Sequence, residues 1–87
     1  MTADPVSWLL IEHGWEVVDR DGGRVGTVHE VLGDYQRDIF DGLAVTTRLL
    51  GTPRYVAAER VANIREGRVE TDVAPDEIEQ LPERNDL

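Results

Sequence analysis

The segment from Trp15 to Asp34 most constrains the fold of this chain, because all its local signals favour a β-hairpin. Apolar residues flank a turn cluster, with Trp15, Val17 and Val18 before it and Val25, Val28, Val31 and Leu32 after it. Asp21-Gly22-Gly23 tolerates positive φ angles and predicts a tight type I′ turn or a slightly longer bulged loop. A lone hairpin is marginally stable in water, so other strands must cover its apolar face.

The second arm of this hairpin has an unusual apolar spacing. Val25, Val28 and Val31 recur every three residues, which suits neither a flat strand nor a helix that contains Gly26. A β-bulge at Gly26-Thr27 returns Val28 to the face of Val25 and permits sharp coiling of the strand. The alternative is a flexible glycine without structural consequence.

The rest of the chain predicts short strands separated by turns. After the hairpin we expect a polar turn over 34–41, with Ile39 and Phe40 folded over a barrel end, then an alternating strand over 43–47 and a loop over 50–53. A strand at Tyr55-Val56 and one helical turn over 57–60 follow, after which Val61 and Ile64 return to the core and Gly67 forms a hairpin turn. The last elements are a strand with Val69, Thr71 and Val73 on one face and a short helix from Pro75 to Pro82 with Ile78 and Leu81 on one face. Structural turn or bulge positions are therefore Asp21, Gly22, Gly26, Gly42 and Gly67. The sequence predicts an all-β fold.

The residues before the hairpin are more apolar than a chain terminus requires. Asp4-Pro5 resembles the start of a helix that ends at Gly14, although an edge strand through Leu9 to Ile11 also fits so short a run. Trp8, Leu9, Leu10 and Ile11 either plug an end of their own barrel or dock on a second copy of the chain. We favour the second interpretation, which predicts a homodimer.

Composition narrows the classes of function. The 87 residues carry 18 acidic side chains against 9 basic ones, and the net charge of -9 repels nucleic-acid phosphates and anionic lipids. There is no cysteine, which excludes disulfides and thiolate chemistry. The longest apolar run, Trp8 to Ile11, is far shorter than the roughly 20 residues that span a bilayer. We expect a cytoplasmic protein that binds neither nucleic acid nor membrane.

No catalytic or cofactor-binding constellation is evident in the sequence. Ser7, the only serine, would need His13 or His29 as a base, and neither spacing indicates a catalytic triad or a zinc site. The glycines after Asp21 lie between two strands, whereas a phosphate-binding loop precedes a helix. We therefore predict no enzyme activity and no cofactor.

One acidic loop remains as a weak candidate metal site. Asp34, Asp38 and Asp41 crowd a single turn and carry the oxygen ligands that hard cations prefer. The ligand spacing and the closing glutamate of an EF-hand are missing. A solvated acidic loop is the simpler interpretation.

Several stretches taken together resemble the PRC-barrel family, in its stand-alone bacterial form. They are Val17-Val18-Asp19, Asp21-Gly22, Val25-Gly26-Thr27-Val28, Val31, Asp38-Ile39-Phe40-Asp41-Gly42-Leu43 and Tyr55-Val56-Ala57-Ala58-Glu59-Arg60-Val61. The resemblance covers the chain from Gly14 to Val73, and its order and spacing are more specific than any one stretch. Ala57 stands where the family often has proline.

The resemblance implies a small PRC-type β-barrel of about six strands with short helical turns near both termini. It divides the chain into an N-terminal extension (1–13), the barrel domain (14–82) and a tail (83–87). Family members generally dock on other macromolecules, which implies a non-enzymatic protein-binding or assembly module with an unknown protein partner. The competing hypothesis is a small-molecule or divalent-metal sensor, or an enzyme, that uses the loop from Asp34 to Asp41.

Overall fold

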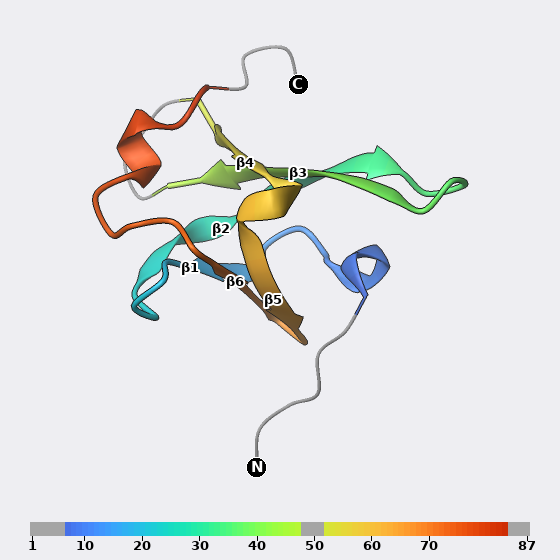
Figure 1. Ribbon diagram of the computed structural model, residues 1–87, viewed down its shortest axis with the longest axis horizontal. Coiled ribbons are helices and arrows are strands. Elements are labelled where there is room, and N and C mark those ends of the chain that lie inside the picture. Colours follow the sequence, from blue (N-terminus) through green and yellow to red (C-terminus); the bar gives the residue numbers. More distant parts are fainter. Residues whose placement is uncertain (1–6, 48–51, 84–87) are drawn as a thin grey trace.

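The computed structural model describes residues 7–47 and 52–83, and over these residues the fold is all-β. The strands are β1 (Glu16–Val18), β2 (Arg24–Asp34), β3 (Ile39–Thr46), β4 (Arg54–Ala57), β5 (Val61–Arg65) and β6 (Arg68–Thr71). The helical parts within the described ranges are three single 3-10 turns, η1 (Trp8–Leu10), η2 (Ala58–Arg60) and η3 (Ile78–Gln80) (Figure 1). The expected strands and the turn at 57–60 are confirmed.

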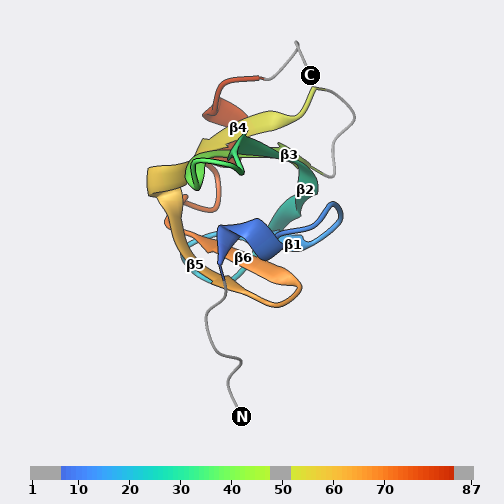
Figure 2. The ribbon, with the colours of Figure 1, turned by 90° about the vertical axis from the view of Figure 1, so that its right-hand side faces the viewer.

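The six strands form one mixed sheet in the order β4-β3-β2-β1-β6-β5. The pair β1 and β6 is parallel, and the other neighbouring pairs are antiparallel. Figure 2 shows that the sheet curls strongly, so that its outer strands β4 and β5 come round to one side, where η2 joins them. The long β2–β3 hairpin extends beyond the other strands on the right of Figure 1.

The core lies on the concave side of this curled sheet and consists mainly of valines. Its buried members are Ile11, Val17, Val28, Leu43, Val45, Val56, Val69, Val73 and Ile78. Ile11 comes from the N-terminal segment and Ile78 from η3, so residues outside the sheet complete the core at both ends of the chain. Val69, Thr71 and Val73 are all buried, as the alternation in the sequence predicts.

The β-bulge predicted at Gly26-Thr27 is real but lies one residue earlier. In the pairing of β1 with β2, Val17 faces Gly26 and Val18 faces Arg24, so Val25 is the extra residue. A second irregularity skips His29 in the pairing of β2 with β3. The two extra residues together explain the spacing of valines in β2, which one bulge had been expected to explain.

Close packing requires a glycine at position 26, which agrees with the prediction that Gly26 has a structural role. It is buried, and a Cβ built there would collide with the main-chain carbonyl oxygen of Thr46 on β3. Gly42 is in the same position relative to the carbonyl oxygen of Val56. Both glycines lie where the backbone of one strand passes tightly over its neighbour, so the interpretation of Gly26 as a residue without consequence is wrong.

The connection between β1 and β2 is the longer loop rather than a two-residue turn. Asp19 organises it: one carboxylate oxygen accepts hydrogen bonds from the main-chain N–H groups of Asp21 (2.8 Å) and Gly23 (2.9 Å). The Asp19 N–H in turn donates to the Gly23 carbonyl oxygen at 2.8 Å, and Gly22 has a φ of 87°. Asp19 is only 6% exposed, because these loop N–H groups satisfy its charge.

The turn between β2 and β3 is shorter than predicted. The polar turn was expected over 34–41, but β2 continues to Asp34 and β3 begins at Ile39, so both strands run into it. Ile39 and Phe40 therefore belong to a strand, with Phe40 half-buried against the core and Ile39 49% exposed. A strand places successive side chains on opposite faces, which is why only one of the two folds inward.

The two terminal segments differ in detail from the sequence prediction. At the N-terminal end, the helical alternative is right for Trp8–Leu10, but Ser7 is its cap; the expected cap Asp4-Pro5 lies outside the described residues. The C-terminal helical turn begins at Ile78 rather than at Pro75 and ends at Gln80, with Leu81 as its C-cap, and so stops before Pro82 as expected. Of the loop predicted over 50–53, only Thr52 and Pro53 are described.

Candidate functional site

The N-terminal turn η1 sorts its four apolar residues into two pairs. A 3-10 turn repeats every three residues, so Trp8 and Ile11 share one face while Leu9 and Leu10 point elsewhere. Ser7 fixes the start of the turn, because its hydroxyl accepts the Leu9 N–H at 3.1 Å. Ile11 is 5% exposed and lies in the core, whereas Leu9 is 41% and Leu10 57% exposed. The turn therefore anchors two of these side chains and presents the other two to solvent.

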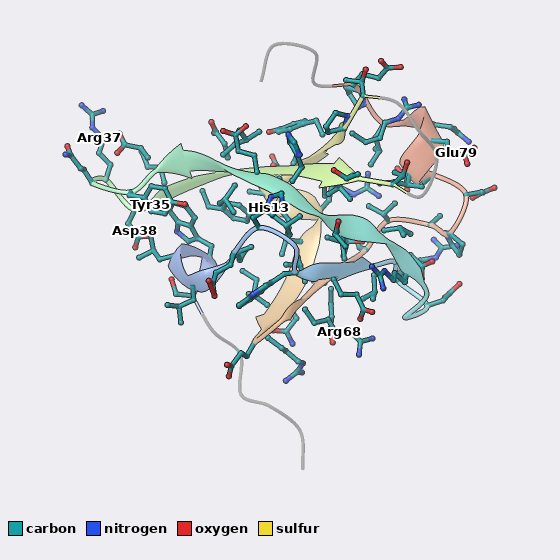
Figure 3. All side chains as sticks on the ribbon, turned by 180° about the vertical axis from the view of Figure 1, so that it is seen from behind. His13, Tyr35, Arg37, Asp38, Arg68 and Glu79 are labelled. Carbon is teal, nitrogen blue, oxygen red and sulfur yellow. The ribbon has the colours of Figure 1, made fainter. Side chains whose placement is uncertain are left out.

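Trp8 anchors the turn beneath the β2–β3 hairpin. Its ring stacks on Tyr35 with a centroid distance of 5.0 Å and on Phe40 at 5.2 Å. Its indole N–H donates to the carboxylate of Asp38 at 2.7 Å. A Cβ at Gly33 would come within 3.1 Å of the indole ring, so the glycine makes room for it. Figure 3 shows Tyr35 and Asp38 together at the tip of the hairpin.

A shallow apolar groove lies beside this anchored turn. We call it the Leu10 groove, and it is lined by Leu10, Glu12, Trp15 and Glu66, with a volume of about 260 Å³. Trp15 is half-buried, and both glutamates are exposed. The lining thus combines two apolar side chains with two exposed carboxylates, and we call the apolar pair, Leu10 and Trp15, the floor of the groove and the carboxylates of Glu12 and Glu66 its rim.

Main-chain hydrogen bonds fix the walls of the Leu10 groove. Trp15 donates its N–H to Glu12 at 3.2 Å and accepts the N–H of Val28 at 2.8 Å. The Glu16 N–H donates to Gly67 at 3.1 Å, which ties the β5–β6 turn, where Glu66 lies, to the start of β1. The groove is thus preformed by the fold rather than by mobile side chains alone.

The three aspartates of the candidate metal loop have separate roles. Asp34 accepts the N–H groups of Gln36 (3.0 Å) and Arg37 (3.2 Å), as an Asx turn does. Asp38 binds the indole of Trp8, and the Asp41 carbonyl oxygen accepts the Tyr55 hydroxyl at 2.8 Å. Within residues 7–47 and 52–83, no three His, Asp or Glu side chains converge as metal ligands would. The structure does not bring these three carboxylates together.

The two histidines lie next to each other, which their separation in sequence did not reveal. His13 Nδ1 is 2.9 Å from the main-chain oxygen of His29, so Nδ1 carries the proton in this arrangement. The ring centroids are 6.0 Å apart, edge to face. Ser7, which a catalytic triad with His13 or His29 would need as its nucleophile, caps η1 instead. The imidazole of His13 is thus a structural donor that joins the N-terminal segment to β2.

A second depression lies at the opposite end of β1. It has a volume of about 360 Å³ and is lined by Val18, Asp19, Arg20, Asp21, Gly22, Ala62, Arg68, Glu70 and Thr71. Its charges are of both signs, and Arg68 Nε lies 3.7 Å from Glu16 and 3.9 Å from Glu70, beyond hydrogen-bonding distance. The pocket offers no apolar floor comparable to that of the Leu10 groove.

An ion cluster that the sequence did not reveal secures the C-terminal segment. The guanidinium of Arg60 forms two parallel hydrogen bonds with Glu77, both 2.8 Å, and its Nε donates to Asp72 at 2.6 Å. The Glu77 carboxylate also accepts the Ala74 N–H at 3.1 Å. The hydrogen bonds from Arg60, with that from Ala74, lower the pKa of Glu77 from its ordinary 4.5 to about 2. The same contacts, with Glu77 first and Asp72 second, raise the pKa of Arg60 above its ordinary value.

No protein-family model matches the chain, and no curated protein is significantly similar to it. Within the described ranges, no helix has the length and apolar character needed to cross a membrane.

Proposed function

We propose that this chain is a non-enzymatic protein-binding or assembly module of the PRC-barrel type, acting in the cytoplasm. The observation that carries the proposal is the division of labour in η1: Trp8 and Ile11 hold the turn in place, while Leu9 and Leu10 remain in solvent. Exposing large aliphatic side chains on a rigid support disfavours the free protein, and covering them with a partner relieves that cost.

The barrel architecture belongs to this proposal. The strand order, the strong curl of the sheet and the position of η2 between β4 and β5 are what a small barrel of about six strands requires (Figure 2). The segment from Gly14 to Val73 resembles the PRC-barrel family, which suggests the type of barrel. The resemblance implies docking on other macromolecules rather than catalysis.

The segment from Trp8 to Ile11 combines the features of a plug with those of an interface. Trp8 and Ile11 pack on their own chain, as a plug would, and Leu9 and Leu10 remain available, as an interface requires. The homodimer predicted from the sequence is one form that such docking takes, and it stays a prediction. Sedimentation of the parent protein at high micromolar concentration measures it directly.

The test of the proposed function compares captured proteins rather than activities. The tagged parent chain, expressed in its own cells, is expected to co-purify a specific protein in stoichiometric amount. The double variant Leu9→Ser/Leu10→Ser removes the exposed pair without touching the anchors, so it should remain folded and lose that protein. Ile39→Ser, at an exposed position of β3, is the matched control. Identical captured proteins for all three chains would reject the proposal.

The competing hypothesis of a metal or small-molecule sensor is tested by thermal shift. A cation that binds only the folded chain raises its melting temperature. The hypothesis requires a rise with a divalent cation that Asp34→Asn/Asp41→Asn abolishes. We expect no such rise, because the two aspartates are not directed to a common point with Asp38.

A further inference from the structure

The Leu10 groove also indicates the chemistry of what it binds. Its volume of about 260 Å³ is below the roughly 300 to 1,000 Å³ of sites that hold drug-sized ligands. It is large enough for a single aliphatic or aromatic side chain. With Leu10 and Trp15 as its floor, it suits an apolar side chain projecting from a partner protein.

The rim of the groove carries negative charge that no ion pair among residues 7–47 and 52–83 neutralises. Glu16, Glu70, Asp72 and Glu77 each lie within ion-pair distance of an arginine. Glu12 and Glu66 have no such ion pair with any other residue in the described part of the chain. The two rim carboxylates therefore add an uncompensated local field to a chain that already has a net charge of -9.

This charge argues against a second copy as the occupant of the groove. A two-fold interface places the same patch on both subunits, so Glu12 and Glu66 would face carboxylates of the partner across an apolar contact. Two chains of charge -9 also repel each other at long range. A cationic partner gains from both effects.

We infer that the Leu10 groove binds a basic segment of another protein, in which a large apolar side chain is flanked by arginine or lysine. The inference rests on the proposed function and specifies its partner. The apolar side chain covers Leu10 and Trp15, and the flanking cations pair with Glu12 and Glu66. Because the rim is exposed, these pairs contribute more to specificity and association rate than to affinity.

The test uses three synthetic peptides with blocked termini: Arg-Arg-Leu-Leu-Arg-Arg, Glu-Glu-Leu-Leu-Glu-Glu and Arg-Arg-Ser-Ser-Arg-Arg. Binding to the full chain is followed by two-dimensional ¹H–¹⁵N NMR. The indole N–H of Trp15 reports on the groove, and that of Trp8, hydrogen-bonded to Asp38, is the internal reference. Only the first peptide is expected to shift the Trp15 signal in a saturable way, with weaker binding as salt is added.

Variants then locate the binding. Leu10→Ala should weaken it about tenfold, since most of one buried aliphatic contact is lost. Glu12→Gln/Glu66→Gln should weaken it about fivefold and reduce its salt dependence. The controls are Ile39→Ala and Glu59→Gln/Glu79→Gln, which make equal changes at exposed positions elsewhere and should leave the affinity unchanged.

Three outcomes overturn the inference. The first is a failure to discriminate between the peptides, in which the acidic and basic peptides bind equally or neither binds. The second is loss of affinity in the control variants. The third is a parent protein that sediments as a dimer and becomes monomeric on Leu10→Arg, since a second copy then fills the groove. A captured protein that still depends on Leu9 and Leu10 would preserve the proposed function in all three cases, so the two failures are distinguishable.

Discussion

Both ends of the described chain close over the curled sheet through a single 3-10 turn, but they are held by different forces. At the N-terminal end, η1 is anchored by aromatic stacking of Trp8 on Tyr35 and Phe40 and by burial of Ile11. At the C-terminal end, η3 is anchored by burial of Ile78 and by the ion cluster of Arg60.

The difference shows in what each turn leaves exposed. Within η3 the exposed residues are polar, namely Glu79 and Gln80, whereas within η1 they are Leu9 and Leu10. A segment whose only task is to cover a core has no need for exposed aliphatic residues. Under the proposed function, the C-terminal turn therefore contributes to stability alone, and the N-terminal turn contributes to both stability and recognition.

The largest effect is expected from the buried anchor of η3. Ile78→Ala removes most of a side chain that is 7% exposed and leaves a cavity at the end of the core. The free energy of unfolding should fall by about 2 to 4 kcal/mol, as in other core truncations. Urea titration measures it, and Glu79→Ala, on the same turn but exposed, should change the midpoint little. Equal midpoints for the parent and Ile78→Ala would mean that η3 is not part of the cooperative core.

The corresponding change at the N-terminal end should be somewhat smaller, because Trp8 is only half-buried. Trp8→Ala loses two ring stacks and one hydrogen bond, and we expect about 2 to 3 kcal/mol of destabilisation. Leu10→Ala, two residues away, should cost less than about 0.5 kcal/mol. Similar losses for both variants in urea titration would contradict the division of η1 into anchoring and presented side chains.

Most of the strands could be predicted from the sequence, because local patterns of apolar residues determine them. Alternating apolar residues located the strands, and Gly67, with a φ of 81°, lies at the turn predicted for it. The bulge was misplaced because Gly26 has two possible reasons to be glycine, a bulge and close packing. The structure shows the second, against Thr46, with the bulge at the neighbouring Val25.

Contacts between distant residues could not be read in the same way. Arg60 lies 17 residues from Glu77, and Trp8 lies 30 from Asp38, so neither pair has a periodic signal in the sequence. Similarly, Leu10 and Glu66 line the same groove because β1 pairs in parallel with β6, a crossover that hydrophobic patterning does not specify. Sequence analysis singled out the apolar segment from Trp8 to Ile11, and the structure was needed to say which of its side chains are exposed.

The ion cluster makes the C-terminal anchor sensitive to pH. The pKa of Glu77 is about 2 in the folded chain and 4.5 ordinarily, so the unfolded chain binds the proton more tightly. The stabilisation by Glu77 is therefore complete above about pH 4.5 and is lost as the pH falls towards about 2. The difference in stability between the parent and Glu77→Gln should shrink over this interval. Glu79→Gln, the matched control, should give a difference that does not depend on pH in this way.

The smallest effect is expected from Asp38, whose carboxylate accepts the indole N–H of Trp8. Asp38 has a φ of 55°, a conformation that asparagine also tolerates, so Asp38→Asn keeps the backbone and an acceptor oxygen and removes only the charge. A hydrogen bond to a charged acceptor is stronger than one to a neutral acceptor, but this one is exposed, so we expect a loss of about 0.5 kcal/mol. The Trp8 indole N–H signal should move upfield, because a weaker acceptor deshields the proton less. A loss as large as that of Trp8→Ala would mean that the N-terminal anchor is electrostatic too, and the contrast between the two ends of the chain would disappear.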